Sequence, residues 1–99
     1  MPMFLVTLRP ARPEMLTEGP TQEEASAVSA HFQYLVRLHE QGALKLAGRT
    51  QDDGPETVGL AFLNAPDLAA AQALVDADPA VVAGVFRAKL QPYAIAVGG

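Results

Sequence analysis

The sequence has no cysteine, and only seven of its 99 residues are lysine or arginine. Without cysteine the chain has no disulfide framework, no thiolate nucleophile and no zinc–thiolate site. The scarcity of basic residues and the net charge of -4 argue against nucleic acid as a partner, because affinity for the phosphate backbone depends on clustered positive charge. No apolar run approaches the roughly 20 residues that a membrane span requires. We therefore expect a cytoplasmic protein with neither nucleic-acid nor membrane partners.

Histidine is also scarce, and His31 and His39 are the only two. Their spacing matches neither His-x-His nor His-x-x-x-His, and a metal site needs more ligands than this pair supplies. The sequence contains no glycine-rich loop of the kind that cradles phosphate groups. We expect the protein to work without a metal ion or cofactor, and we interpret His39 as a solvated residue near a helix C-terminus.

The remaining composition, 49% hydrophobic and 18% charged, is typical of a globular protein, because the apolar surface is large enough to offset the entropy of ordering the chain. A chain of 99 residues suits one hydrophobic core. We expect residues 1–97 to form a single domain and residues 98–99 to form a short C-terminal tail.

Two segments have helical patterns. Thr21 and Glu24 have the spacing of a capping box, which predicts a long helix that ends at Gly42. The predicted core-facing stripe of this helix consists of Ala25, Val28, Phe32, Leu35 and Val36. For the second helix, Asn64 is the predicted N-cap and Asp78-Pro79 the predicted end. Its predicted buried face consists of Leu68, Ala71, Leu74 and Val75.

Four segments have the apolar character of strands. They span residues 3–8, 44–50, 57–63 and 86–97, and Pro92 is a possible interruption in the last. The order β-α-β-β-α-β predicts an α+β, ferredoxin-like domain with both helices on one face of an antiparallel sheet. Several strands are apolar on both sides, so a monomer would expose an apolar sheet face. We expect a homodimer in which two sheets pack face to face.

His31 and Asp78 are the residues best suited to proton transfer. His31 lies on the flank of the first helix's stripe, and Asp78 precedes a proline that restricts its geometry. A carboxylate that accepts from an imidazole N–H makes the histidine a stronger base and defines its tautomer. From spacing alone, the simpler interpretation of His31 is a boundary histidine on an amphipathic helix. The corresponding alternative for Asp78 is a turn residue.

Arg9, Arg49 and Tyr34 are the candidate substrate-binding residues. Each arginine leaves an expected strand, where its guanidinium can hold a carboxylate or phenolate with a planar pair of donors. Tyr34 follows His31 by three residues on the same helical side, so its hydroxyl can donate to a substrate oxygen. The alternatives are solvated strand-end charges for the arginines and a core aromatic for Tyr34.

The order and spacing of several motifs resemble the YCII-related (YciI-like) family. The motifs are His31-x-x-Tyr34-Leu35, Gly42-x-Leu44-x-x-Ala47-Gly48, Ala70-Ala71-Gln72-Ala73-Leu74 and Asp76-Ala77-Asp78-Pro79-x-Val81-x-Ala83-Gly84-Val85. The resemblance covers nearly the whole chain, from the first strand to the Pro92-Tyr93 pair. It implies a dimeric α+β barrel of ferredoxin-like domains and a catalytic His–Asp pair that maps onto His31 and Asp78.

The resemblance also implies a class of reaction. Where an activity is attributed in the family, it is a cofactor-free elimination of halide from a small hydroxylated aromatic. The leading hypothesis is a cofactor-independent lyase or isomerase for a small aromatic or enolisable anion, with His31 as the general base or acid and Asp78 as its orienting partner. The alternative is a non-catalytic dimeric module that binds a small molecule or serves as an accessory to another protein.

Overall fold

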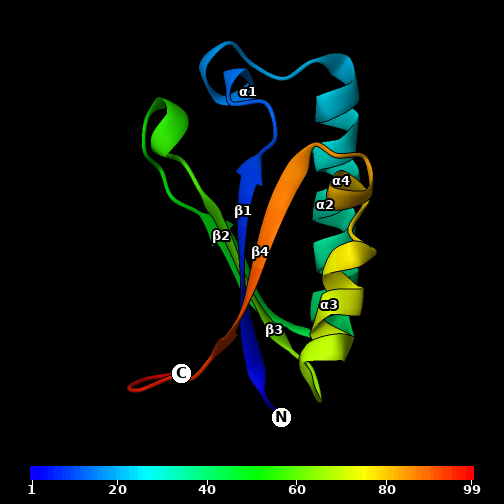
Figure 1. Ribbon diagram of the computed structural model, residues 1–99, viewed down its shortest axis with the longest axis vertical. Helices are drawn as coiled ribbons and strands as arrows, with labels where there is room; N and C mark the ends of the chain where they lie inside the picture. The colour runs from blue at the N-terminus through cyan, green and yellow to red at the C-terminus, as the bar shows by residue number, and fades with distance from the viewer.

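A computed structural model describes all 99 residues and contains one four-stranded sheet with helices packed against one face (Figure 1). The strands are β1 (Met3–Pro10), β2 (Leu44–Arg49), β3 (Gly59–Asn64) and β4 (Phe86–Tyr93). The helices are α1 (Glu14–Thr17), α2 (Gln22–Glu40), α3 (Leu68–Asp76) and α4 (Pro79–Val82), with a 3-10 turn, η1, at Gly54–Glu56. The strand order β2-β3-β1-β4, antiparallel throughout, confirms the predicted α+β, ferredoxin-like fold.

The long helix α2 begins with the predicted capping box. The Thr21 hydroxyl accepts from the Glu24 backbone N–H at 3.1 Å, and the Glu24 carboxylate accepts from the Thr21 backbone N–H at 2.8 Å. The helix ends at Glu40, and Gly42 follows with φ of 80°, a left-handed conformation that favours glycine. The chain then reverses, so α2 and β2 run in opposite directions (Figure 1). None of the helices combines the length and apolar character that crossing a bilayer demands.

The core lies between the sheet and the helices. On β1, Phe4, Val6 and Leu8 are buried, whereas the residues between them are not, because successive side chains of a strand point to opposite faces. Leu63 on β3 and Val75 on α3 belong to the same buried cluster. The two-residue period of the apolar side chains thus determines which side of β1 faces the helices.

The predicted core-facing stripe of α2 is only partly right, because Leu35 packs against the core and the rest of the stripe does not. The buried residues of α2 are Ala27, His31 and Leu38, whereas Phe32 is 61% exposed and Val36 is 39% exposed. At about 100° per residue the two sets lie on different faces of the helix, more than a third of a turn apart. An apolar period shows that a helix face avoids water but does not show whether it packs against a core or lines an open pocket.

The start of α3 also differs from the prediction. Asp67 is the N-cap, and its carboxylate accepts from the Ala70 backbone N–H at 2.8 Å. Asn64 instead ends β3, and its side-chain amide donates to the Gly42 carbonyl at 3.3 Å. Of the predicted buried face of α3, Leu68 is exposed. The helix therefore starts later than expected, and its first residue lies outside the core.

The last strand is shorter than predicted. β4 ends at Tyr93 and not at Val97, and Pro92 lies within it without breaking the pairing with β1. A proline is tolerated there because β4 is an edge strand, where the missing backbone N–H leaves no neighbour unpaired.

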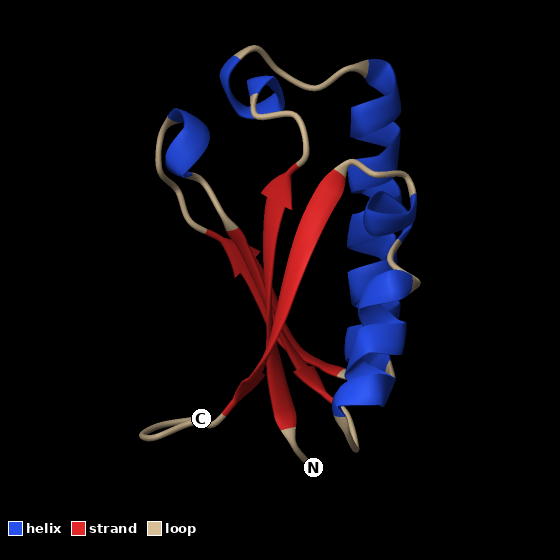
Figure 2. Ribbon diagram, in the orientation of Figure 1, coloured by secondary structure: helices blue, strands red, loops and turns tan.

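The face of the sheet that carries no helix is called the outer face here (Figure 2). The strand register places Leu5 beside Phe62, and Phe62 packs edge-to-face against Tyr93 with ring centroids 5.0 Å apart. Both Leu5 and Phe62 are partly exposed, and Tyr93 is exposed. The outer face thus carries the apolar side chains expected of it, and no helix of the chain covers them.

Candidate active site

His31 and Asp78 form a hydrogen-bonded pair that joins α2 to the start of α4. The His31 Nδ1 and Asp78 Oδ2 atoms are 2.6 Å apart, and the two side chains are only 11% and 7% exposed. In such a sheltered setting a hydrogen bond is electrostatically stronger than it is in water. The structure therefore brings together the two residues that the sequence marked for proton transfer.

Asp78 is held in place by its own backbone as well as by His31. It is the N-cap of α4, and its Oδ1 accepts from the Ala80 backbone N–H at 2.9 Å. Pro79, in the first turn, fixes the backbone dihedral that starts the helix. One carboxylate oxygen caps the helix and the other contacts the imidazole. The helix cap therefore holds the carboxylate in position independently of His31.

The contact with Asp78 determines which nitrogen of His31 is free. An ionised carboxylate only accepts, so a neutral imidazole donates its Nδ1–H to Asp78 and keeps a lone pair on Nε2. Nε2 has no partner within the chain, yet the protein has no buried side-chain nitrogen without one, so Nε2 is open to solvent. The ring of Phe86 lies 5.1 Å from that of His31 at an interplanar angle of 79° and limits its rotation.

His31 forms part of the wall of a cavity of about 840 Å³ between α2 and β2, called the α2–β2 pocket here. Apolar side chains dominate its lining, and α1 closes one end. Arg49 and Lys45 lie on its wall, whereas no aspartate or glutamate does. Acidic residues outnumber basic ones by 11 to seven in the chain, so a pocket wall with two basic residues and no acidic one differs from the chain as a whole. The pocket favours an anionic ligand over a cationic one.

Residues that the sequence assigned to the core line this pocket. Val28, Phe32, Leu35 and Val36 all contribute to its wall. His39, interpreted from the sequence as solvated, is indeed exposed but also lies on the pocket wall. The signal that could have placed it there is its spacing of seven residues from Phe32 and four from Leu35, which continues the apolar stripe.

Arg49 is the predicted binding residue that the structure places at the pocket. The register aligns Arg49 with Gly59 and Leu8 across the sheet, on the side that faces the helices. Its guanidinium takes part in neither of the two ion pairs of the chain, Arg12–Glu24 and His31–Asp78. It is therefore available to a carboxylate or phenolate in the pocket.

Tyr34 and Arg9 lie elsewhere. The Tyr34 hydroxyl donates to the Leu74 backbone carbonyl at 2.6 Å, so it ties α2 to α3 and does not line the α2–β2 pocket. Burial raises the pKa of Tyr34 above its usual value, and the negative charge of Asp78 raises it further. Arg9 alternates with the buried Leu8 and so points to the outer face, where Arg87 is its cross-strand neighbour.

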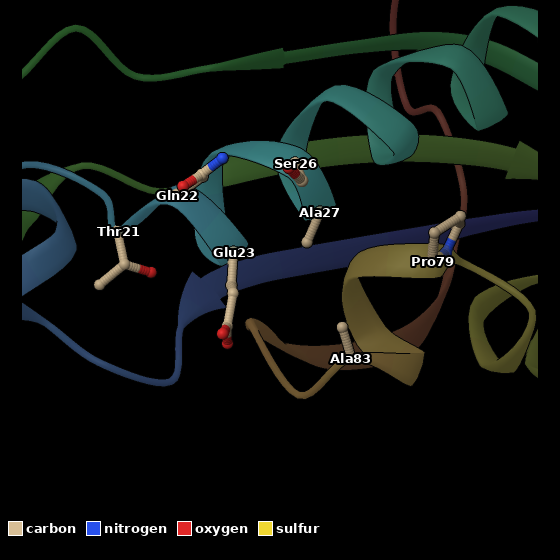
Figure 3. Close-up of a pocket in the computed structure, with 7 residues that line it drawn as sticks. All are labelled: Thr21, Gln22, Glu23, Ser26, Ala27, Pro79 and Ala83. Atoms are coloured by element: carbon tan, nitrogen blue, oxygen red, sulfur yellow. The ribbon is translucent and has the colours of Figure 1, made fainter.

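A second hollow, of about 750 Å³, lies where the first turn of α2 meets α4 (Figure 3). Figure 3 shows the Glu23 carboxylate pointing into open space, and the labelled polar side chains do not converge on a common point. The hollow contains none of the predicted site residues. In the whole chain, no group of three or more His, Cys, Asp or Glu side chains is arranged to hold a metal ion.

The chain is similar to a solved structure of an enzyme. It is 5-chloro-2-hydroxyhydroquinone dehydrochlorinase from Burkholderia phenoliruptrix AC1100, in complex with 2,5-dihydroxybenzoquinone. The two structures align with a TM-score of 0.67 at 24% identity, over 93% of each chain, which shows that the fold is shared. No curated protein matches the sequence. The family model of the YCII-related domain matches residues 3–90, nearly the whole chain, and the protein therefore belongs to the YCII-related domain family.

Proposed function

We propose that this protein is a cofactor-independent enzyme of the lyase or isomerase type that transfers a proton on a small, largely apolar anion. The observation that carries the proposal is the His31–Asp78 pair on the wall of the α2–β2 pocket, with Nε2 of His31 unpartnered. A base needs a free lone pair, a fixed orientation and a site that holds its substrate. These three conditions meet at His31.

In the proposed reaction, Nε2 of His31 removes a proton from a substrate carbon next to a carbonyl or hydroxylated ring carbon. The C–H electron pair moves into the substrate and forms an enolate or a related stabilised anion, and the new imidazolium faces the Asp78 carboxylate. Return of the proton to a different atom completes an isomerisation. In an elimination the anion instead expels a halide ion, and the His31 imidazolium then releases its proton to solvent. Asp78 acts as a positioning residue that orients the ring and stabilises its positive charge.

Arg49 is the proposed anchor of the substrate anion. Its guanidinium has no acidic partner within the chain and lies on the helix-facing side of the sheet, where it can pair with a carboxylate or phenolate. The fold neighbour supports elimination as one version of the reaction, because it is a dehydrochlorinase. Loss of HCl from a hydroxylated ring requires transfer of a proton, which a histidine base can perform without a metal ion.

Proton transfer can be tested before the natural substrate is known. We expect the protein to catalyse deuterium exchange from D₂O into the acidic C–H positions of small phenolic and enolisable anions, measured by NMR. His31→Ala should lower the rate by at least about 100-fold, and Asp78→Asn by at least about tenfold. Asp76→Asn is the matched control, because Asp76 is exposed and bonds only to Gln72 on the surface of α3. Full exchange in His31→Ala would overturn the assignment.

The role of Asp78 has a readout that does not depend on turnover. The ¹⁵N chemical shifts of the His31 ring show which nitrogen carries the proton, and we expect Nδ1–H in the wild type. In Asp78→Asn the amide can donate to Nδ1 and favour the opposite tautomer. Binding of anions in the pocket without any exchange would instead support the second function, a non-catalytic small-molecule-binding module in which the pair is structural.

A further inference from the structure

The pocket-facing side of α2 is a continuous stripe and not a single position. Val28, Phe32, Leu35 and His39 follow one another at helical spacing and all line the α2–β2 pocket, with His31 and Val36 on either flank. From Val28 to His39 the stripe extends about 16 Å along the helix axis, at 1.5 Å per residue. His31 lies near one end of this stripe and His39 at the other, about 12 Å apart along the axis.

The opposite wall has the same length. Every residue of β2, from Leu44 to Arg49, contributes to the pocket, and at about 3.3 Å per residue the strand also extends about 16 Å. Because α2 and β2 run in opposite directions, His39 lies at the Leu44 end and His31 toward the Arg49 end. The pocket is therefore an elongated groove with one histidine toward each end and an apolar middle.

This groove is larger than a one-ring substrate needs. An apolar cavity of about 150 Å³ is enough to hold benzene, whereas the α2–β2 pocket measures about 840 Å³. Phe32 and Val36 border the middle of the groove and are 61% and 39% exposed, so the chain itself leaves this apolar surface uncovered. Exposed apolar surface that lines a cavity is typical of a binding site.

We infer that the α2–β2 pocket binds an elongated apolar anion, with two linked or fused rings or a comparable chain, whose reacting end meets His31 and whose far end carries an acidic group that meets His39. The inference rests on the proposed function only in placing the reacting end at His31. The occupant is anionic because the wall carries Arg49 and Lys45 and no carboxylate. His39 is exposed and only its backbone takes part in hydrogen bonds, so its imidazole is free to bind the far group.

The experiment compares three probes by calorimetry and by ¹H–¹⁵N NMR. They are para-hydroxybenzoate, para-hydroxybiphenyl, and the biphenyl that carries a hydroxyl on one ring and a carboxylate on the far end of the other. We expect the biphenyl carboxylate to bind at least about tenfold more tightly than para-hydroxybenzoate. It should shift the ring signals of both His31 and His39, whereas para-hydroxybenzoate should shift only those at the His31 end.

Two variants separate length from charge at the far end. Val36→Trp should reduce the affinity for both biphenyls to that for para-hydroxybenzoate, because the indole fills the middle of the groove. His39→Ala should weaken the biphenyl carboxylate by about tenfold and leave para-hydroxybiphenyl unchanged. Gln33→Trp is the matched control for Val36→Trp, because Gln33 is exposed on α2 and does not line the pocket.

Equal affinity for the one-ring and two-ring carboxylates, or an unchanged preference in both Val36→Trp and His39→Ala, would overturn the inference. Shifts of the groove signals that depend on protein concentration and not on ligand would also overturn it, since they would assign the groove to a second copy of the chain. These readouts are binding measurements. If the protein binds the long anion but catalyses no exchange, this inference therefore stands and the proposed function is wrong.

Discussion

At the residue scale, each buried polar side chain of this protein has a hydrogen-bond partner. His31 and Asp78 satisfy each other, and the Tyr34 hydroxyl reaches the Leu74 carbonyl. The sequence indicated the chemistry of His31 and Asp78. The proline after Asp78 restricts the backbone that positions the carboxylate, and a carboxylate held in this way can accept a hydrogen bond from a histidine ring. It could not predict their contact, which depends on how the chain leaves α3 and enters α4.

Tyr34 offers a test at this scale. Tyr34→Phe should lower the free energy of unfolding by about 1 kcal/mol near neutral pH, because it removes the hydrogen bond to the Leu74 carbonyl. The pKa of Tyr34 is raised in the folded state, mainly by burial. The stabilising effect of the hydroxyl is thus complete below pH 10.0, the ordinary pKa of a tyrosine, and is lost as the pH rises through the folded-state value.

Denaturant unfolding near pH 8 and near pH 11 measures this effect. We expect the difference between wild type and Tyr34→Phe to shrink at the higher pH. Tyr93→Phe is the control, because the Tyr93 side chain is exposed and its hydroxyl makes no hydrogen bond. A difference that is the same at both pH values would contradict the account of Tyr34.

At the element scale, α2 has two apolar faces with different functions. One face packs Ala27 and Leu38 into the core, and a different face presents Phe32 and Val36 to the α2–β2 pocket. The start of α2 could be predicted because a capping box is a local pattern. The rotation of α2 about its own axis could not be predicted, because periodicity gives the direction of an apolar face but not what that face packs against. The short helix α1 was not predicted, since four residues after a proline pair carry no usable period.

The ion pair between Arg12 and Glu24 fixes α1 to the start of α2. The Arg12 guanidinium donates to both carboxylate oxygens of Glu24, at 2.9 and 2.7 Å, and to the Gly19 carbonyl at 3.1 Å. The hydrogen bond from Arg12, followed by that from the Thr21 backbone, lowers the pKa of Glu24 to about 2. The stability that Glu24 contributes is therefore present above pH 4.5, its ordinary pKa, and is lost as the pH falls toward 2.

Thermal melts between about pH 6 and pH 2, followed by circular dichroism, test this arrangement. The wild type should lose its stability advantage over Glu24→Gln across the lower part of that range. Glu23→Gln is the control from the same first turn, because Glu23 is exposed and forms no ion pair. If both variants respond to acid alike, the Arg12–Glu24 pair does not hold α1 in place.

At the scale of the whole molecule, the helices protect only one face of the sheet (Figure 2). The order of the four strands and of the two longer helices, α2 and α3, was predictable from the sequence, because each of these segments shows its own period and the turns between them are marked by glycine and proline. The homodimer remains a prediction. The outer face supports it with partly exposed Leu5, Leu60 and Phe62, which a monomer leaves in contact with water.

The mass in solution tests the dimer directly. Sedimentation equilibrium at micromolar concentration should give twice the monomer mass of 10.4 kDa. Leu5→Glu and Tyr93→Glu should each shift the equilibrium toward monomer, because they place a charge in the middle or at the end of the outer face. Gln33→Glu, on the exposed side of α2, should not. A wild type that sediments only as a monomer would contradict the prediction.

The position of Asp78 has a consequence for biosynthesis. The contact with His31 closes a loop of 47 residues, and the entropic cost of such closure rises with the logarithm of loop length, by about 0.6 kcal/mol per doubling. A ribosome-bound chain that has already formed α2 still lacks the carboxylate that orients His31. The nascent chain therefore lacks the His31–Asp78 contact until its last third has been translated and docked, and this buried pair forms only as the fold is completed.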